Sequence, residues 1–417
     1  MKCIMNRGLY LRADGRMPCY CSSGETITLN KLPDQEELSF DFFQDYYCKG
    51  SFSRIRKSML EDLVPFPGIC EQCSYLDVES EFQKGMDEKE LEWFHWEPSS
   101  LCMLDCEWCR KERKRYSNSA QRRLLPMELF ERVVDSFAQR NIRLKMGNVC
   151  GVGEPTTNPK VWDQIALVHQ RLGGDILLST NGNGPYSDKI ISSGLTKIKI
   201  AIDALDQEIY QRYRKNGKLS NVFKFTEEIV KAKELQRSEY PIIIWQYILF
   251  NYNDSDKDLI RLQKMALSYG VNRLRIVYTR CNNYSERELN EFPKIFPDID
   301  FYPISQYSQI GLTEVRSIVK NIHLLIERKK FKQSMLDTMQ LINRIYHRFA
   351  LGLKDYTQLL DFARGFKYLK FDNQLNFHQE EFQEYRQHIK ESFMLLHKLS
   401  SYLGYSEQAE RYMSFIQ

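Results

Sequence analysis

The chain has 417 residues, of which 42% are hydrophobic and 27% are charged, and its net charge of +4 is too small to indicate a nucleic-acid partner. This length can bury one large core or two to three ordinary domains. No apolar run of about 18 residues predicts a membrane helix, and the first residues, MKCIMNRGLYLRADG, lack the apolar segment of a signal peptide, so we expect a cytoplasmic protein that binds neither nucleic acid nor membranes.

Residues 1 to 85 are rich in cysteine and show little helical periodicity. Leu9 and Leu11 alternate with polar residues before the turn signal Asp14-Gly15, so residues 8–21 (GLYLRADGRMPCYC) predict a β-hairpin. A segment with so few apolar residues needs a cross-link to fold. Disulfides are rare in a reducing compartment, which makes metal binding or catalysis the expected use of its six cysteines, Cys3, Cys19, Cys21, Cys48, Cys70 and Cys73.

Residues 88 to 284 alternate between strand and helix patterns. Strands are predicted at 92–97, 143–149, 175–180, 197–203, 241–250 and 272–278, with amphipathic helices at 127–140, 159–172, 221–236 and 256–269. Serial β/α units predict a parallel sheet with right-handed crossovers, either open or curled into a barrel. In such sheets the chemistry gathers at the carboxyl ends of the strands.

Residues 285 to 417 begin with a connection that contains Pro293, Pro297 and Pro303. Helices are predicted beyond it at 312–328, 331–350, 355–367 and 378–402. We therefore expect three parts, a cysteine-rich module at 1–85, an α/β domain at 88–284 and an all-helical domain at 285–417.

Three cysteines follow the first predicted strand of the α/β domain, Cys102, Cys106 and Cys109. Three thiolates can hold three irons of a [4Fe–4S] cluster and leave the fourth iron for a ligand from outside the protein. Zinc is the alternative, although a structural zinc site takes four ligands and the nearest histidine is His95, upstream of the triplet.

The triplet has the spacing C-x3-C-x-aromatic-C, with Trp108 as the aromatic residue, and resembles the signature of the radical S-adenosylmethionine (radical SAM) superfamily. Two later segments are similar to companion motifs of that family. GVGEP, residues 151–155, resembles its GGEP segment, with Val152 in place of the usual first glycine, and STNG, residues 179–182, resembles its ribose-contacting segment. The resemblance covers roughly residues 90 to 280 and implies a partial (β/α)6 barrel.

The same resemblance implies a radical enzyme whose open iron binds S-adenosylmethionine. A reduced cluster would cleave this cofactor to methionine and a 5'-deoxyadenosyl radical, which takes a hydrogen atom from the substrate. Relatives often have serine where this chain has Ala201, and Asp203 is either a cavity residue or a helix cap. The implied cofactor-binding residues are Gly153, Glu154, Pro155, Ser179, Thr180, Asn181, Asp203 and Gln246.

The N-terminal cysteines are similar to a SPASM or twitch module, which binds auxiliary [4Fe–4S] clusters and in most relatives follows the barrel. Residues 52–60 (FSRIRKSML) resemble the helix that precedes its C-x2-C pair. The expected ligands are Cys3, Cys19, Cys70 and Cys73, with Cys21 and Cys48 as substitutes, and zinc is the alternative metal.

The partners follow from these expectations. The basic run RKERKRY, residues 110–116, is either a solvated face or the docking site of a flavodoxin or ferredoxin-type reductant. Cys281 is either a buried apolar residue or a hydrogen-atom donor, and Cys150 is expected to be buried.

We expect an oxidoreductase that acts on a peptide or protein side chain. The alternatives are a dehydrogenase or epimerase of a sugar or aminoglycoside, and a non-catalytic iron–sulfur electron carrier.

Overall fold

The computed structural model describes most of the α/β region and parts of the two flanking regions. The described residues are 2–19, 28–32, 40–61, 63–66, 70, 76–77, 89–107, 109, 124–278, 283, 285, 287, 291–304 and parts of 318–341 and 379–413. Among them, no helix is long and apolar enough to cross a membrane.

The centre of the molecule is an eight-stranded sheet in the order β12-β11-β10-β9-β8-β7-β6-β2, and every neighbouring pair is parallel. The predicted α/β class and all six predicted strands are confirmed. The strands are β2 (Gly8–Leu11), β6 (Glu90–Trp96), β7 (Arg143–Val149), β8 (Asp175–Thr180), β9 (Lys197–Ala201), β10 (Ile242–Leu249), β11 (Arg273–Tyr278) and β12 (Asp300–Ile304).

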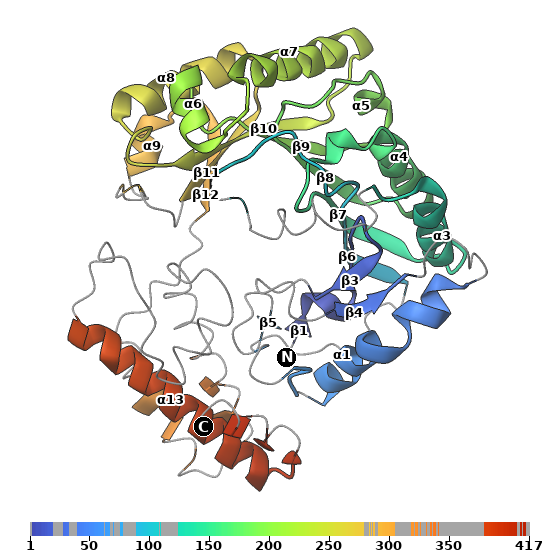
Figure 1. Ribbon diagram of the computed structural model, residues 1–417, viewed down its shortest axis with the longest axis vertical. Helices are drawn as coiled ribbons and strands as arrows, with labels where there is room; N and C mark the ends of the chain where they lie inside the picture. Colours follow the sequence, from blue (N-terminus) through green and yellow to red (C-terminus); the bar gives the residue numbers. More distant parts are fainter. Residues whose placement is uncertain are drawn as a thin grey trace.

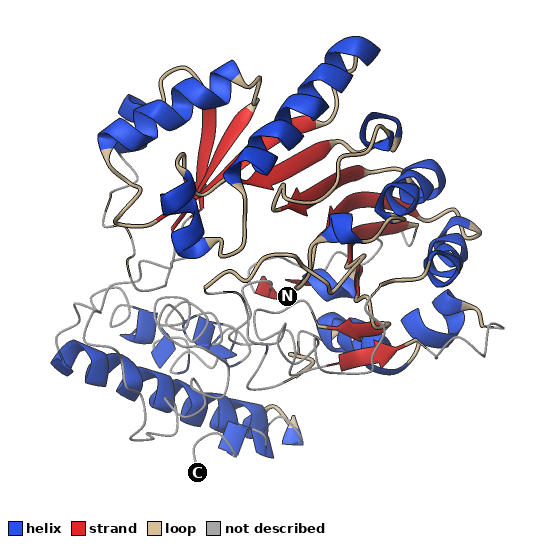
Figure 2. Cartoon of the chain, turned by 45° about the horizontal axis from the view of Figure 1, so that its top comes forward, coloured by secondary structure: helices blue, strands red, loops and turns tan. Residues whose placement is uncertain are grey.

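The helices between the strands lie in an arc outside the sheet (Figure 1). They are α3 (Met127–Ala138), α4 (Val161–Leu172), α5 (Lys189–Ser192), α6 (Gln207–Tyr213), α7 (Leu219–Gln236) and α8 (Asp256–Ser268). Figure 2 shows the same succession of helices beside the strands. The sheet is therefore covered on its outer face, as serial β/α units require.

The two faces of the sheet differ in polarity. On β10 the alternate residues Ile243, Trp245, Tyr247 and Leu249 are buried, and the Trp245 Nε1 donates a hydrogen bond of 3.1 Å to Thr226 of α7. These residues therefore face the helices. Because successive side chains of a strand point to opposite faces, Gln246 faces the inner side of the curved sheet.

The predicted hairpin at residues 8–21 is wrong. The chain does turn there, since the Gly15 N–H donates to the Arg12 carbonyl at 2.9 Å. However, β2 joins β6 in the main sheet, whereas β3 (Arg16–Pro18) pairs with β4 (Thr28–Lys31) in a separate sheet. The reason is that an isolated two-stranded hairpin is at best marginally stable, whereas joining the main sheet buries Leu9 and Leu11 fully.

The cysteine-rich region packs against the α/β domain. The helix predicted at 52–60 is confirmed as α1 (Gly50–Leu60), which buries Phe52, Ile55 and Met59. The preceding segment η2 (Phe43–Tyr47) places the Tyr47 ring 5.2 Å from the Phe137 ring of α3. Two short elements, β1 (Lys2–Cys3) and β5 (Leu76–Asp77), pair antiparallel, and η1 (Ile4–Asn6) follows β1.

The C-terminal region contains a strand, so the prediction that it is entirely helical is wrong. After α9 (Phe292–Ile295), the strand β12 forms the edge of the main sheet. It contains Pro303, and an edge strand tolerates a proline because it has ladder bonds on one side only. The helix predicted at 378–402 is confirmed as α13 (Gln379–Tyr402).

Further helical residues lie between 318 and 341, and they contact α13 through the Phe331 and Tyr402 rings at 4.4 Å. The helix predicted at 355–367 lies outside the described residues.

Candidate active site

The cysteine loop, residues 98–109, leaves the carboxyl end of β6 and is held by main-chain bonds on two sides. On one side the Glu154 N–H donates to the Leu101 carbonyl at 2.7 Å. On the other, the N–H groups of Asp105 and Glu107 each donate at 3.0 Å, to the carbonyls of Lys215 and Tyr213. The loop is therefore fixed between the β7 and β9 connections, at the edge where parallel sheets place their chemistry.

N–H donors point at the sulfur atoms of Cys102 and Cys106. The Cys102 Sγ accepts from the Leu104 N–H at 3.5 Å and from the Asn181 amide at 3.6 Å, and the Cys106 Sγ accepts from the Arg214 guanidinium at 3.6 Å. Burial raises the pKa of the Cys106 thiol, and Arg214 opposes this by favouring the thiolate.

Cys102, Cys106 and Cys109 form no disulfide, and sulfurs that receive N–H bonds fit the ligands of an iron–sulfur cluster. In the part of the chain that the structure describes, no three side chains of His, Cys, Asp or Glu come together as ligands of a single metal ion.

The segment Gly151–Pro155 runs directly against the cysteine loop. A Cβ atom at Gly153 would lie 2.2 Å from the Ser99 carbonyl oxygen, and one at Gly151 would lie 2.3 Å from the Glu97 carboxylate. Gly153 therefore needs to be glycine, whereas a side chain at Gly151 would require the Glu97 carboxylate to shift. Val152, where the family usually has another glycine, donates its N–H to the Glu97 carboxylate at 3.1 Å.

Glu154 joins this segment to the loop that follows β8. Its Oε1 accepts from the Thr156 N–H (3.2 Å), the Thr156 hydroxyl (2.8 Å) and the Thr180 hydroxyl (2.7 Å). Its Oε2 accepts from the Asn181 N–H at 2.8 Å. Burial raises the pKa of Glu154, and these four hydrogen bonds act against that rise. Both oxygens have protein partners, so Glu154 positions the two loops relative to each other.

Asp203 forms a buried ion pair that sequence analysis did not predict. Its Oδ2 lies 2.6 Å from the Nε and 2.5 Å from the Nη2 of Arg214, and its Oδ1 accepts from the Ile248 N–H at 2.8 Å. Burial raises the pKa of Asp203, and Arg214 opposes this. The helix-cap interpretation is wrong, because Asp206 occupies the N-cap of α6.

Arg214 is the functional candidate that sequence analysis missed. Its guanidinium contacts both Asp203 and the Cys106 sulfur. It follows the last residue of α6 and belongs to none of the quoted motifs, so the sequence carried no signal for it beyond the charge itself.

The remaining predicted cofactor residues lie along the same edge. Pro155 begins the short helix η4 (Pro155–Thr157). Ser179 has a buried hydroxyl with no hydrogen-bond partner among the described residues. Gln246 pairs in register with Ala201 on one side and Arg275 on the other. The structure thus brings together the segments after β7 and β8 with the cysteine loop.

Only some of the other cysteines lie among the described residues. Cys3, Cys19 and Cys70 are buried among apolar side chains. Cys48 is partly exposed; burial raises the pKa of its thiol, and Arg56 and Arg140 oppose this. The predictions for Cys21, Cys73, Cys281, Trp108 and the basic run 110–116 concern positions outside the described residues.

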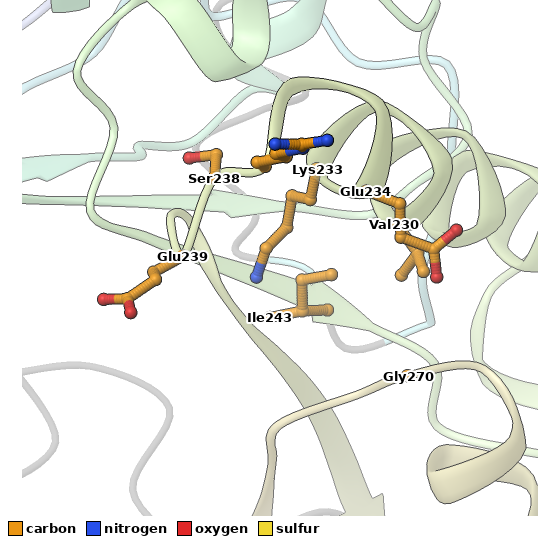
Figure 3. A pocket seen from close by; sticks show the side chains of 8 residues that line it. Val230, Lys233, Glu234, Ser238, Glu239, Ile243 and Gly270 are labelled. Carbon is orange, nitrogen blue, oxygen red and sulfur yellow. The ribbon is translucent and has the colours of Figure 1, made fainter.

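A hollow of about 370 Å³ lies beside the amino end of β10 (Figure 3). Its lining comes from the end of α7 and the start of β10, including Lys233, Arg237 and Ile243. The Lys233 amine donates to the Pro241 carbonyl at 2.8 Å. This hollow is remote from the cysteine loop, because it adjoins the amino end of β10.

Comparison with known proteins agrees with this geometry. The family model described as the Radical SAM superfamily matches residues 96–264, which span the cysteine loop and the segments after β7, β8 and β9. Residues 96–264 of the chain form a radical SAM domain. A radical SAM domain implies a [4Fe–4S] cluster and S-adenosylmethionine, and the three cysteines and two glycine positions described above fit these groups.

Curated relatives match the radical SAM region only. A GTP 3',8-cyclase of Alkaliphilus metalliredigens is 27% identical over 161 residues, which is 38% of this chain and 48% of that protein. A protein of Pyrococcus horikoshii named as a probable GTP 3',8-cyclase is 27% identical over 158 residues, 37% of this chain and 46% of its own. The chain spans about half the length of the curated relatives it matches.

Solved structures show a partial likeness. Streptococcus suis SuiB aligns with a TM-score of 0.40 at 15% identity, covering 66% of this chain and 57% of its own. A radical SAM methyltransferase from Sphaerobacter thermophilus aligns with a TM-score of 0.38 at 15% identity, covering 50% of this chain and 64% of its own.

Proposed function

We propose that this chain is a radical SAM enzyme that removes a hydrogen atom from a substrate held on the inner face of its sheet. The observation that carries the proposal is the cysteine loop, fixed by main-chain bonds between the Glu154 segment and the end of α6. Cys102, Cys106 and Cys109 would hold the cluster. Gly153, Glu154, Pro155, Ser179, Thr180, Asn181, Asp203 and Gln246 would surround the cofactor. When bound, these groups supply one-electron cleavage of S-adenosylmethionine and a 5'-deoxyadenosyl radical.

The protein's own contribution is position and charge. Arg214 donates a hydrogen bond to the Cys106 sulfur and forms an ion pair with Asp203. A thiolate at Cys106 therefore lies beside a guanidinium whose orientation is fixed. Glu154 keeps the segment after β7 and the segment after β8 in one arrangement. A preformed site of this kind lowers the ordering cost of cofactor binding.

Anaerobic reconstitution with iron and sulfide tests the proposal. The wild-type protein is expected to bind a [4Fe–4S] cluster by absorption and EPR spectroscopy and to form 5'-deoxyadenosine with dithionite. Cys106→Ala is expected to lose both, whereas Cys150→Ser, the matched control outside the cysteine loop, should keep the cluster. An intact cluster with persistent absence of 5'-deoxyadenosine would favour the electron-carrier alternative instead.

The N-terminal cysteines would bind an auxiliary [4Fe–4S] cluster through Cys3, Cys19, Cys70 and Cys73. Support comes from the burial of the first three of these thiols within the N-terminal region. Metal analysis of a variant with Cys102, Cys106 and Cys109 all changed to alanine separates iron from zinc. That variant is expected to retain about four irons if the auxiliary cluster exists, and zinc without iron would refute it.

The reaction would be an oxidation of a peptide or protein side chain, driven by a flavodoxin or ferredoxin-type reductant that docks at residues 110–116. A nucleotide substrate is the second candidate, since the curated relatives are named GTP 3',8-cyclases. Deuterated candidate substrates distinguish the two. Transfer of deuterium into 5'-deoxyadenosine from a peptide and not from GTP is the expected result, and the reverse would move the nucleotide ahead.

A further inference from the structure

The inner face of the sheet carries polar side chains on the five neighbouring strands β8 to β12, and Cys150 follows the next strand, β7. Ser179 of β8 lies opposite Lys199 of β9, and Gln246 of β10 lies opposite Arg275 of β11, which in turn lies opposite Tyr302 of β12. Cys150 follows Val149, whose partner on β8 is Leu178, so Cys150 adjoins Ser179. The outer-face neighbours Ile198 and Ile200 are fully buried and apolar.

Two cations lie within this polar face. Burial and the charge of Arg275 lower the pKa of Lys199 from 10.5 to about 8. Among the described residues, the other group that acts on Lys199 is Cys150, whose thiol stays protonated because burial raises its pKa. The Lys199 side chain is partly exposed and makes no ion pair with any described residue, so no described carboxylate neutralises it.

The Glu97 carboxylate, whose charge acts on Cys150, already has partners. The Glu97 carboxylate accepts from the Val152 N–H at 3.1 Å and lies 3.9 Å from the Arg12 guanidinium. The hydroxyl of Ser179, beside Lys199, is buried and has no partner in the described part of the chain. A protonated amine and an unused hydroxyl on adjacent strands are the donors that an oxyanion requires.

We infer that the inner face binds a substrate through an oxyanion, a carboxylate or a phosphate, held by Lys199 and Ser179 beside Arg275. This inference rests on the proposed function, since it takes the inner face of the sheet as the surface that binds the substrate. A bound oxyanion relieves the repulsion between the two cations and accepts charge-assisted hydrogen bonds, which are stronger than neutral ones. The site therefore selects against neutral sugars and neutral side chains.

Calorimetric titration of the anaerobic, reconstituted holoenzyme tests the inference with three probes, inorganic phosphate, pyrophosphate and N-acetylglutamate. We expect at least one probe to bind at a single site, and phosphate against glutamate tells which oxyanion is preferred. Lys199→Gln should weaken binding by about 10- to 100-fold, whereas Lys199→Arg, which keeps the charge, should stay within about threefold.

Lys197→Gln is the matched control, because Lys197 lies two residues earlier on the same strand and pairs with Asp175 at 3.0 Å. Binding that is unchanged in Lys199→Gln, or no binding of any probe to a wild-type enzyme with its full iron content, would overturn the inference. Failure to form 5'-deoxyadenosine counts against the proposed function alone, because the calorimetric loss in Lys199→Gln supports the oxyanion site without it.

Discussion

Replacing Glu154 with glutamine tests whether this residue joins the two cofactor loops. Glutamine keeps one acceptor oxygen and replaces the other with an NH2 donor. Whichever way the amide turns, its NH2 faces a backbone N–H, either that of Asn181 or that of Thr156. A hydrogen bond to a charged group is lost and one buried N–H is left without an acceptor, which costs about 2 kcal/mol. The hydroxyls of Thr156 and Thr180 can reverse their roles and add little to the cost.

Urea unfolding of the reconstituted protein under argon measures this change, together with calorimetric affinity for S-adenosylmethionine. We expect the free energy of unfolding to fall by about 2 kcal/mol and cofactor affinity to fall with it. Glu131→Gln is the control, since Glu131 is exposed on α3 and pairs with Arg171 at 3.5 Å, and such surface pairs contribute at most about 1 kcal/mol. A Glu154→Gln variant within about 0.5 kcal/mol of wild type would refute the positioning role.

Three further substitutions address the rest of the site. Gly153→Ala forces a Cβ to 2.2 Å from the Ser99 carbonyl, so it should destabilise the cysteine loop by about 1–3 kcal/mol and lower the iron content, and full iron loading would contradict this. Asp203→Asn keeps a residue type that tolerates the backbone φ of 49° but leaves the charge of Arg214 without its partner. The free energy of unfolding should therefore fall by about 3–5 kcal/mol. A loss below about 1 kcal/mol would show that the ion pair is not desolvated. Lys199→Met should raise the free energy of unfolding at pH 7 by up to about 3 kcal/mol, because the depressed pKa means that the unfolded chain binds the proton more tightly. Wild-type stability should rise between the folded pKa of about 8 and the ordinary value of 10.5, and a difference between the two proteins that is constant from pH 7 to 10 would exclude this cause.

The sequence was enough to predict the features that depend on residues close together along the chain. Apolar runs such as IIIWQYIL give buried parallel strands, and the spacing of Cys102, Cys106 and Cys109 was enough to locate the cysteine loop after the first strand of the α/β domain. The glycines of GVGEP were also informative, because close backbone approach leaves no room for a side chain.

Long-range contacts were not predictable in this way. The partner of Asp203 is Arg214, 11 residues further on and outside any motif. The strand β12 was missed because three prolines in this segment indicated a linker. The inner polar face did leave a signal, since in KIKIA the lysines alternate with the buried Ile198 and Ile200, which is the period of a strand with one polar face.

The pairing of β2 with β6 has a consequence for how the sheet holds together. Gly8 lies opposite Trp93, so the edge strand closes a loop that contains most of the cysteine-rich region. Bringing the ends of such a loop together costs about 4 kcal/mol of chain entropy, and a longer loop costs more. A metal bound by Cys19 and Cys70 would cross-link two points within this loop and so reduce the entropy cost of closing it. Loss of an N-terminal cluster would then weaken the pairing of β2 with β6, the strand that leads into the cysteine loop.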